Sequence, residues 1–187
     1  MFLSRAVILF FTLLFTSHLA HGANCDPATG STIDPRPLVN GWGVNSLNHR
    51  FIAEAAAGVT PANLHTLRPK WVFALPDTDA PRFLPLVTPD TLVIGDAPGV
   101  VYALDRETGC EKWRFDAGAM VRTAFRYIAH EDEHLVVFGT LEAELIALDL
   151  LSGRQKWRLR VDQHPRAMIS GSAVDHAGVI YQPVSSW

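Results

Sequence analysis

Two histidines stand at the spacing that zinc peptidases use. His130-Glu-Asp-Glu-His134 reproduces the His-Glu-x-x-His pattern, in which two imidazoles bind the metal and the glutamate acts as a general base. That chemistry needs a helix, because only a helix places residues i and i+4 on the same face. Here the pattern joins two apolar runs, 125–129 and 135–138, that are typical of β-strands. We therefore interpret it as a polar hairpin loop.

The chain contains only two cysteines, Cys25 and Cys110. Two cysteines allow one intramolecular disulfide. The sequence gives no distance between them, so a bridge and two separate thiols both remain open. No Cys-x-x-Cys-His motif occurs, which excludes a c-type haem attached in that way.

The first 22 residues predict a signal peptide. Arg5 is followed by an apolar run over 6–16, and Ala20-His-Gly22 supplies small residues before a cleavage site. A retained anchor is the alternative, but the run is shorter than the ~20 residues that cross a bilayer. We expect a periplasmic or secreted protein with no membrane span after cleavage. An oxidising compartment of this kind would preserve a disulfide.

An internal repeat defines the elements that must position any site. Val101-Tyr-Ala-Leu-Asp-Arg-Glu-Thr-Gly-Cys-Glu-Lys-Trp113 aligns with Leu145-Ile-Ala-Leu-Asp-Leu-Leu-Ser-Gly-Arg-Gln-Lys-Trp157, 44 residues later. A period near 44 residues, with several short strands in each unit, predicts an all-β fold of the β-propeller type. The recurring residues that we expect to be structural are Asp105, Asp149, Gly109, Gly153, Trp71, Trp113 and Trp157.

Each unit is expected to form one four-stranded blade. The first would use strands at 82–88, 91–95, 99–104 and 110–116, and the second strands at 122–129, 134–139, 143–148 and 154–160. A third unit begins with 166–174 and 179–184.

A lone outer strand is expected near Lys70-Trp-Val-Phe73, after a short helix at 60–67 with Thr60 as its N-cap. The predicted organisation is a signal peptide (1–22), an N-terminal segment (23–67) and an incomplete propeller (68–187). Repeats bury their faces only against neighbours, and about three are needed for stability. We therefore expect a fragment that is poorly soluble or oligomeric.

Composition narrows the function classes. The net charge is −3 and 48% of residues are hydrophobic, so a buried core is feasible. No basic stripe appears, and a nucleic-acid partner is not expected.

The Ala-Leu-Asp-x-x-[Thr/Ser]-Gly-x-x-x-Trp repeat resembles the tryptophan-docking repeat of quinoprotein dehydrogenases. Asn40-Gly-Trp-Gly-Val-Asn-Ser-Leu-Asn-His-Arg-Phe51, followed by Leu67-Arg-Pro-Lys-Trp-Val-Phe73, is similar to the opening segment of polyvinyl-alcohol-dehydrogenase-like quinoproteins. The resemblance covers residues 40–187. It implies a propeller of about eight blades that holds pyrroloquinoline quinone (PQQ) and calcium, oxidises alcohols and passes electrons to a c-type cytochrome.

The resemblance carries over to few site residues. It implies that Arg122 and Thr123 contact the quinone, and that Ser170 matches a cofactor-contacting threonine. The alternative for each is an ordinary loop or strand position. Arg82 departs from the pattern, because relatives carry a glutamate there. The segment after Ser186 would supply a calcium-binding glutamate in relatives.

Two functions therefore remain open. The first is the N-terminal portion of a periplasmic PQQ-dependent alcohol dehydrogenase, acting on primary, secondary or polymeric alcohols when complete and inactive as this chain alone, with neither PQQ nor calcium bound. The second is a scaffold propeller that binds other proteins in the cell envelope.

Overall fold

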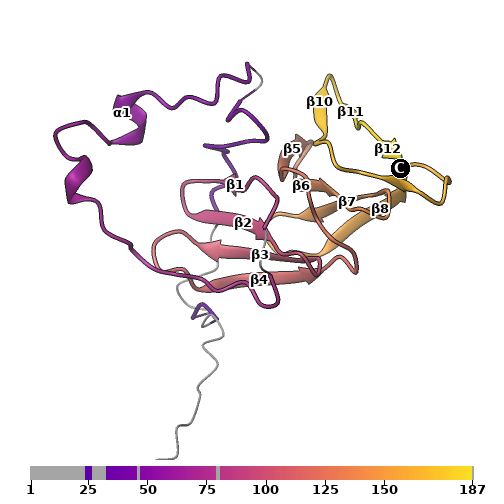
Figure 1. Ribbon diagram of the computed structural model, residues 1–187, viewed down its shortest axis with the longest axis horizontal. Helices are drawn as coiled ribbons and strands as arrows, with labels where there is room; N and C mark the ends of the chain where they lie inside the picture. Colours follow the sequence, from indigo (N-terminus) through magenta and orange to yellow (C-terminus); the bar gives the residue numbers. More distant parts are fainter. Residues whose placement is uncertain (1–23, 27–32, 46, 79–80, 187) are drawn as a thin grey trace, which may run out of the picture.

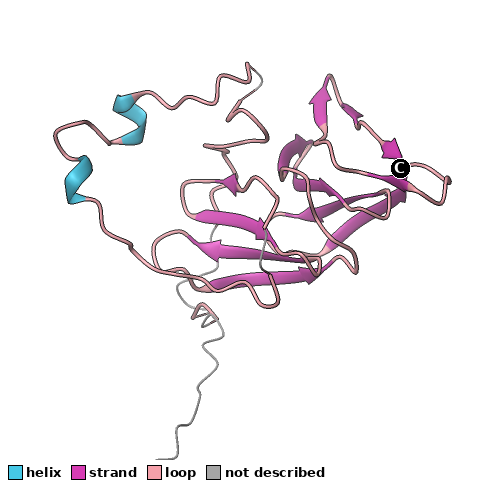
Figure 2. Ribbon diagram, in the orientation of Figure 1, coloured by secondary structure: helices cyan, strands magenta, loops and turns pink. Residues whose placement is uncertain are grey.

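Two four-stranded antiparallel sheets stand side by side in this computed structural model (Figures 1 and 2). It describes residues 24–26, 33–45, 47–78 and 81–186, so the predicted signal peptide lies outside the described residues. Within those ranges, every helix is too short or too polar to cross a membrane.

The strands of both sheets follow chain order, each pairing with the next. This arrangement confirms the prediction of two complete propeller blades. The first contains β1 (Leu86–Val87), β2 (Thr91–Gly95), β3 (Val100–Asp105) and β4 (Glu111–Asp116), and the second β5 (Arg126–His130), β6 (Glu133–Gly139), β7 (Glu144–Asp149) and β8 (Gln155–Arg160).

The strands expected at 82–88 and 122–129 are shorter than predicted, because their first halves pair between blades. Leu84 forms an isolated parallel bridge with Ala124, and the Phe125 amide donates to the Leu84 carbonyl at 3.1 Å. The backbone groups that would have extended each blade's first strand instead join the two blades at their inner edges.

A third unit begins after β8, and its predicted strands are divided. Within the strand expected at 166–174 the structure has only β9 (Ala167–Met168) and the first residue of β10 (Val174–His176). The strand expected at 179–184 is confirmed over β11 (Val179–Tyr181), and β12 (Ser185–Ser186) follows it. The interruption has a physical cause, since Ile169 donates its amide to the Thr140 carbonyl at 3.1 Å. The third unit is thus hydrogen-bonded to the second blade at the point where its own strand is interrupted.

The core lies between the blades and within their central strands. Val101, Ala103, Val136 and Ile146 are fully buried, as expected for strands covered on both faces. The ring of Phe125 packs 5.3 Å from that of Phe138, between the centroids. Phe125 follows the inter-blade bridge, and Phe138 lies in β6. The contact therefore holds the bridging segment against the sheet of the second blade.

Trp71 and Trp113 each rest on the turn of the following blade. A Cβ atom at Gly153 would lie 2.6 Å from the Trp113 ring, and one at Gly109 would lie 2.6 Å from Trp71. Each indole also donates a hydrogen bond to that turn: Trp113 to the Leu150 carbonyl at 2.9 Å and Trp71 to that of Arg106 at 3.0 Å. Only glycine permits such close contact, and its positive φ also suits the turn.

The expected outer strand at Lys70–Phe73 is wrong. Residues 67–75 form no β-ladder, and the Val72 side chain is 87% exposed. The described residues supply no neighbouring strand of that blade, so this segment has no edge with which to pair. Trp71 and a Phe73–Tyr102 ring contact at 5.2 Å hold it through side chains instead.

Among its described residues, the N-terminal segment forms two short helices. The helix predicted at 60–67 is a turn followed by the 3₁₀-helix η1 (Leu64–Thr66), and a further turn of α-helix, α1 (Glu54–Ala57), precedes it. Thr60 is not the N-cap of η1, because η1 begins only at Leu64, with Asn63 before it. Thr60 and Asn63 instead stabilise the preceding turn: the Thr60 hydroxyl accepts the Asn63 amide, and the Asn63 side chain accepts the Thr60 amide.

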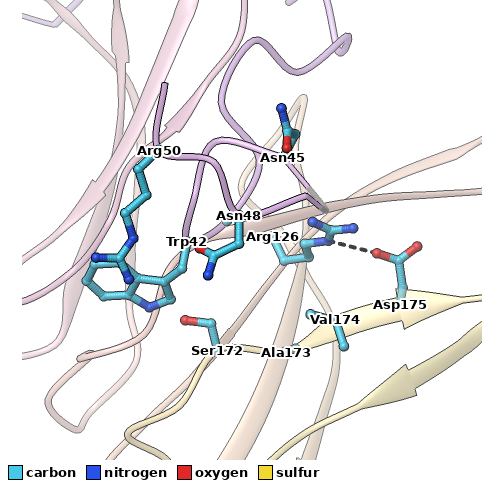
Figure 3. Close-up of a pocket in the computed structure, with 10 residues that line it drawn as sticks. Trp42, Asn45, Asn48, Arg50, Arg126, Ser172, Ala173, Val174 and Asp175 are labelled. Carbon is cyan, nitrogen blue, oxygen red and sulfur yellow. Dashed lines mark hydrogen bonds and ion pairs between the residues drawn. The ribbon is translucent and has the colours of Figure 1, made fainter. Parts of the chain in front are cut away.

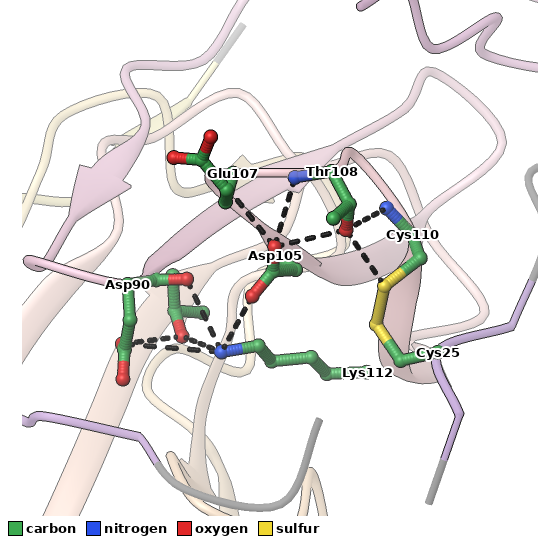
Figure 4. Close-up of a disulfide and its surroundings, with 8 residues drawn as sticks. Cys25, Asp90, Asp105, Glu107, Thr108, Cys110 and Lys112 are labelled. Carbon is green, nitrogen blue, oxygen red and sulfur yellow. Dashed lines mark hydrogen bonds and ion pairs between the residues drawn. A yellow bond between two sulfur atoms is a disulfide. The ribbon is translucent and has the colours of Figure 1, made fainter. Parts of the chain in front are cut away.

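A disulfide joins Cys25 to Cys110, with 5.0 Å between their Cα atoms (Figure 4). It ties the N-terminal segment to the turn before β4, where Asp105 accepts hydrogen bonds from the Glu107 and Thr108 amides. The nearly buried Lys112 amine lies 3.5 Å from Asp105. The second blade repeats the turn but has no such bridge, because Arg154 stands where the first has Cys110.

Candidate functional site

The register of the sheets aligns three blades residue by residue. Leu86 pairs with Val93 in the first blade, Arg126 with Val137 in the second, and Val174 with Tyr181 in the third. The second-strand partners are 44 residues apart each time, so the three first-strand residues are structurally equivalent. This frame locates every candidate site residue within its repeat.

Arg82, Arg122 and Ser170 occupy one equivalent position in the three blades. Each stands four residues before the aligned first-strand residue. A propeller places equivalent positions in a ring around its axis. The residue that departs from the family pattern and two predicted cofactor contacts therefore belong to the same ring.

Arg122 and Ser170 line a single pocket of about 320 Å³. Its wall is completed by Met168, Ser185 and Ser186. The hydroxyl oxygens of Ser170 and Ser185 are 3.1 Å apart, because β9 and β12 pair next to them. The pocket thus offers one guanidinium and three hydroxyls, a set suited to a ligand with oxygen acceptors.

The backbone around Arg122 is fixed from both sides. Val121 forms an antiparallel bridge with Thr140, and the Ala124 amide donates to the Ser172 hydroxyl at 2.6 Å. These bonds join the start of β5 to the second blade's loop and to the third unit. Arg122 is therefore presented by a segment with little freedom to move.

Thr123 does not line this pocket. It is fully buried, and its hydroxyl accepts the Gly139 amide at 3.0 Å. Arg82 is exposed and lies outside the pocket's lining residues. The structure thus brings together two of the three predicted cofactor contacts and gives Thr123 a bonding role within the blade.

The buried carboxylates of the first blade are engaged elsewhere. Asp96 is 2% exposed and accepts the Gly99 and Val100 amides and the Tyr102 hydroxyl. Burial, aided by the hydrogen bond to Asp96, raises the pKa of Tyr102 to about 12. These groups stabilise the β2–β3 turn and do not face the Arg122 pocket.

The His-Glu-x-x-His pattern lies in the β5–β6 hairpin, as predicted. Ala129 pairs with His134, and His130 with Glu133, across the turn. The His134 ring stacks on Tyr127 and its Nδ1 lies 2.9 Å from the tyrosine hydroxyl. Across residues 24–26, 33–45, 47–78 and 81–186, no three His, Cys, Asp or Glu side chains converge on one metal-sized position.

Sequence reasoning missed a second pocket, next to the loop of residues 40–45 and 47–50. It measures about 440 Å³ and includes Trp42, Arg126, Ser172 and Asp175 in its lining (Figure 3). Its residues come from three distant parts of the chain. No repeat signal marks them, since the aligned position holds Leu86, Arg126 and Val174 in successive blades.

The two successive blades, the 44-residue register and the docked tryptophans define a β-propeller sector built from PQQ-type repeats. A family profile of such repeats, described as Outer membrane protein assembly factor BamB, matches residues 40–182. The chain belongs to this family.

Two curated relatives share 32% identity over 151 residues. They are the polyvinylalcohol dehydrogenases of Pseudomonas sp and of Sphingopyxis sp. (strain 113P3), and the match covers 79% of this chain. It covers 23% and 22% of the two relatives, so the chain spans less than a quarter of their length.

Solved structures show the same fold. A quinohemoprotein alcohol dehydrogenase from Comamonas testosteroni superposes with a TM-score of 0.65 at 19% identity, over 85% of this chain and 24% of the other. A europium-containing methanol dehydrogenase superposes with a TM-score of 0.60 at 23% identity, over 79% and 28% of the two chains.

Proposed function

We propose that this chain is the N-terminal portion of a periplasmic PQQ-dependent alcohol dehydrogenase-like propeller, and that it contributes one sector of the cofactor site. The observation that carries the proposal is the pocket shared by Arg122 and Ser170. Two residues at one repeat position, from neighbouring blades, line the same cavity. The relatives are named as alcohol dehydrogenases, which favours an alcohol substrate, polymeric or small.

The pocket's residues fit one edge of a quinone bearing carboxylates. The Arg122 guanidinium can donate two parallel hydrogen bonds to a carboxylate, or a hydrogen bond to a carbonyl oxygen. Hydroxyls from Ser170, Ser185 and Ser186 can orient the same edge. When bound together with calcium, PQQ would accept a hydride from the alcohol. This chain's part is to bind and orient the cofactor, and a c-type cytochrome is the proposed electron acceptor.

The fit to calcium is poorer. Calcium takes six to eight oxygen ligands, with carboxylates prominent among them, and the residues lining the Arg122 pocket include no carboxylate. The same lining offers no base for the alcohol proton. We therefore propose that this chain alone gives no turnover and does not retain the cofactor after dialysis.

A titration of purified chain with PQQ, with and without calcium, tests this function. We expect weak quinone binding that Arg122→Ala abolishes and Ser170→Ala weakens, since each removes donors from one edge of the cofactor. Thr108→Ala, far from the pocket in the β3–β4 turn, is the matched control. Dye reduction with alcohols should not exceed the free-cofactor background. Turnover that depends on Arg122, or quinone binding that ignores it, would contradict the proposal.

A protein-binding scaffold is the second candidate. The matching family profile is described as an assembly factor, and Arg82 places a cation where quinoprotein relatives are expected to carry an acid. The same titration separates the two candidates, because a scaffold predicts no quinone binding at all.

A further inference from the structure

The outer edge of the first blade is paired with a segment from outside the blade. β4 and β8 are each the last strand of a sheet (Figure 1), so each has a row of backbone groups that its own sheet leaves unpaired. Asn24 forms a parallel bridge with Glu111 in β4, and the Cys25 amide donates to the Glu111 carbonyl at 3.0 Å. The edge of a blade in this chain can therefore accept an extended segment.

The second blade lacks such a segment at the equivalent edge. Glu111 is 8% exposed, whereas Gln155, at the same position of the repeat, is exposed. Among the described residues, none forms a backbone bridge or hydrogen bond to the outer edge of β8. Propeller blades pack face to face around the axis, so a following blade would cover the face of β8 and leave this edge open.

The backbone groups at the open edge belong to Arg158 and Arg160. The Val161 amide donates to the Ala143 carbonyl at 2.9 Å, toward the interior of the sheet. Alternate residues of an antiparallel strand bond to the same neighbour, so Arg158 and Arg160 direct their amides and carbonyls outward. β8 thus offers both donors and acceptors to an added strand.

The charge on this edge is positive. Residues 154–160 include four cations and no acid. Lys156 pairs with Glu133 of β6 at 2.8 Å, and Arg158 pairs with Glu144 of β7 at 2.9 Å. Both glutamates belong to strands behind the edge, so they balance two of the four cations from within the sheet.

The other two cations, Arg154 and Arg160, stand at the two ends of β8. Neither forms an ion pair with any described residue. Asp149 and Asp162 flank the strand, but each carboxylate accepts an amide of its own turn. Arg154 and Arg160 are six residues apart, which is about 20 Å along an extended strand. An approaching strand therefore meets two unbalanced guanidinium groups at that separation.

We propose that the open edge of β8 binds an acidic, extended segment of another protein, which adds to the sheet parallel to β8 as residues 24–25 add to β4. Figure 4 shows the Cys25–Cys110 bridge that holds the latter pair together, and Arg154 stands where the first blade has Cys110. A carboxylate at the place of the Cys25 thiol pairs with Arg154, and a second one, about six residues further along the segment, pairs with Arg160.

Charge selects the partner, whereas the backbone supplies the general attraction. Main-chain hydrogen bonds are common to every strand that adds to an edge, so they favour no sequence. Cations on an edge strand disfavour pairing with basic or uncharged strands, including further copies of β8, and favour an acidic one. The edge shares no residue with the Arg122 pocket, so a partner can bind here whether or not that pocket holds a quinone.

Fluorescence anisotropy of the purified chain with a labelled peptide tests the proposal. The peptide is rich in threonine and valine and carries two glutamates six positions apart. We expect saturable binding that Arg154→Glu and Arg160→Glu each weaken roughly fivefold, since each reversal replaces an exposed ion pair by a repulsion. Added salt should weaken binding too. Arg166→Glu, which reverses an exposed arginine outside β8, is the matched control and should retain the affinity.

Hydrogen exchange distinguishes strand addition from simple charge attraction. The bound peptide should slow exchange at the Arg158 and Arg160 amides, and a peptide with a central proline, which lacks an amide donor, should bind more weakly. Thermal melting of each variant checks its fold. Equal weakening by Arg166→Glu, equal binding of a glutamine peptide, unprotected amides, displacement by anionic lipid vesicles or no binding at all would each overturn the proposal. All of these outcomes leave the quinone titration unaffected.

Discussion

The outer strands of the two blades carry the same tryptophan in different surroundings. Trp113 of the first blade is 9% exposed and packs on the second blade's turn at Gly153. Trp157 of the second blade is only half-buried, and no turn among the described residues covers it. It lines an apolar groove with Leu145, Leu159, Val161 and Ile180. A repeat tryptophan is therefore buried by the blade that follows, and not by its own.

The comparison implies that stability in this fold belongs to the contacts between neighbouring units. Replacing Trp113 should break such a contact, whereas replacing Trp157 should not. We expect Trp113→Ala to lower the free energy of unfolding by about 3–5 kcal/mol. For Trp157→Ala, which removes a partly solvated side chain, we expect about 1 kcal/mol or less. Urea denaturation measures both, and equal losses would refute the comparison.

The disulfide adds a second difference, since only the first blade is tied covalently to the N-terminal segment. Cys25→Ser should cost about 2–4 kcal/mol, because the bridge restricts a long loop of the unfolded chain. The Arg154→Ala variant changes the equivalent position of the second blade and serves as control. Denaturation under non-reducing conditions measures the loss. A Cys25→Ser protein as stable as the parent would show that the bridge contributes nothing.

The glycines beneath the tryptophans sharpen the comparison. Gly153→Ala should cost about 1–3 kcal/mol, because the new methyl meets the Trp113 ring within a packed core. Gly109→Ala introduces the same contact with Trp71, but that segment has no ladder and can shift. Its effect should therefore be smaller. Thermal unfolding of the two variants tests the order, and the reverse order would contradict it.

The smallest effect concerns acid stability. Burial alone would raise the pKa of Asp105, but hydrogen bonds from Thr108 and Glu107 and the charge of Lys112 together lower it. A lowered folded-state pKa means that this stabilisation is present above the ordinary carboxyl pKa and is lost as pH falls through the folded value. Asp105→Asn should therefore flatten the loss of stability below about pH 4, by about 1 kcal/mol or less. Denaturation midpoints measured from pH 6 to pH 2.5 check this.

Much of the fold was predictable because the same strand and turn motif occurs twice in the sequence. Asp105 and Asp149, with their glycines and tryptophans, recur at one spacing and act through local geometry. The first strand of each blade was predicted too long, because Leu84 and Ala124 bond between the blades. Strand propensity indicates an extended segment but not the strand with which it pairs. The segment at Trp71 was predicted as a strand because its residues match the motif, although the matching edge is missing from the described residues.

The candidate sites divide in the same way. Arg122 and Ser170 could be proposed from family resemblance, and their equivalence within the repeat emerges only from the sheet register. Trp42, Arg126 and Asp175 could not be found, because each lies at a position where the repeats differ and the contact spans 49 residues or more. Long-range contacts between unlike residues leave no pattern in a single sequence.

The docking of Trp71 has a consequence for how copies of this chain can associate. Trp71 and Trp113 each pack on the next turn in one direction only, so a second copy could add head to tail by placing its Trp157 on the turn at Gly109. Head-to-tail contacts of that type either close into a ring or grow into an open filament, depending on the rotation between copies. Trp71 already occupies that turn, so it blocks the addition of a second copy there. Removing the indole with Trp71→Ala should therefore shift sedimentation velocity profiles toward larger species.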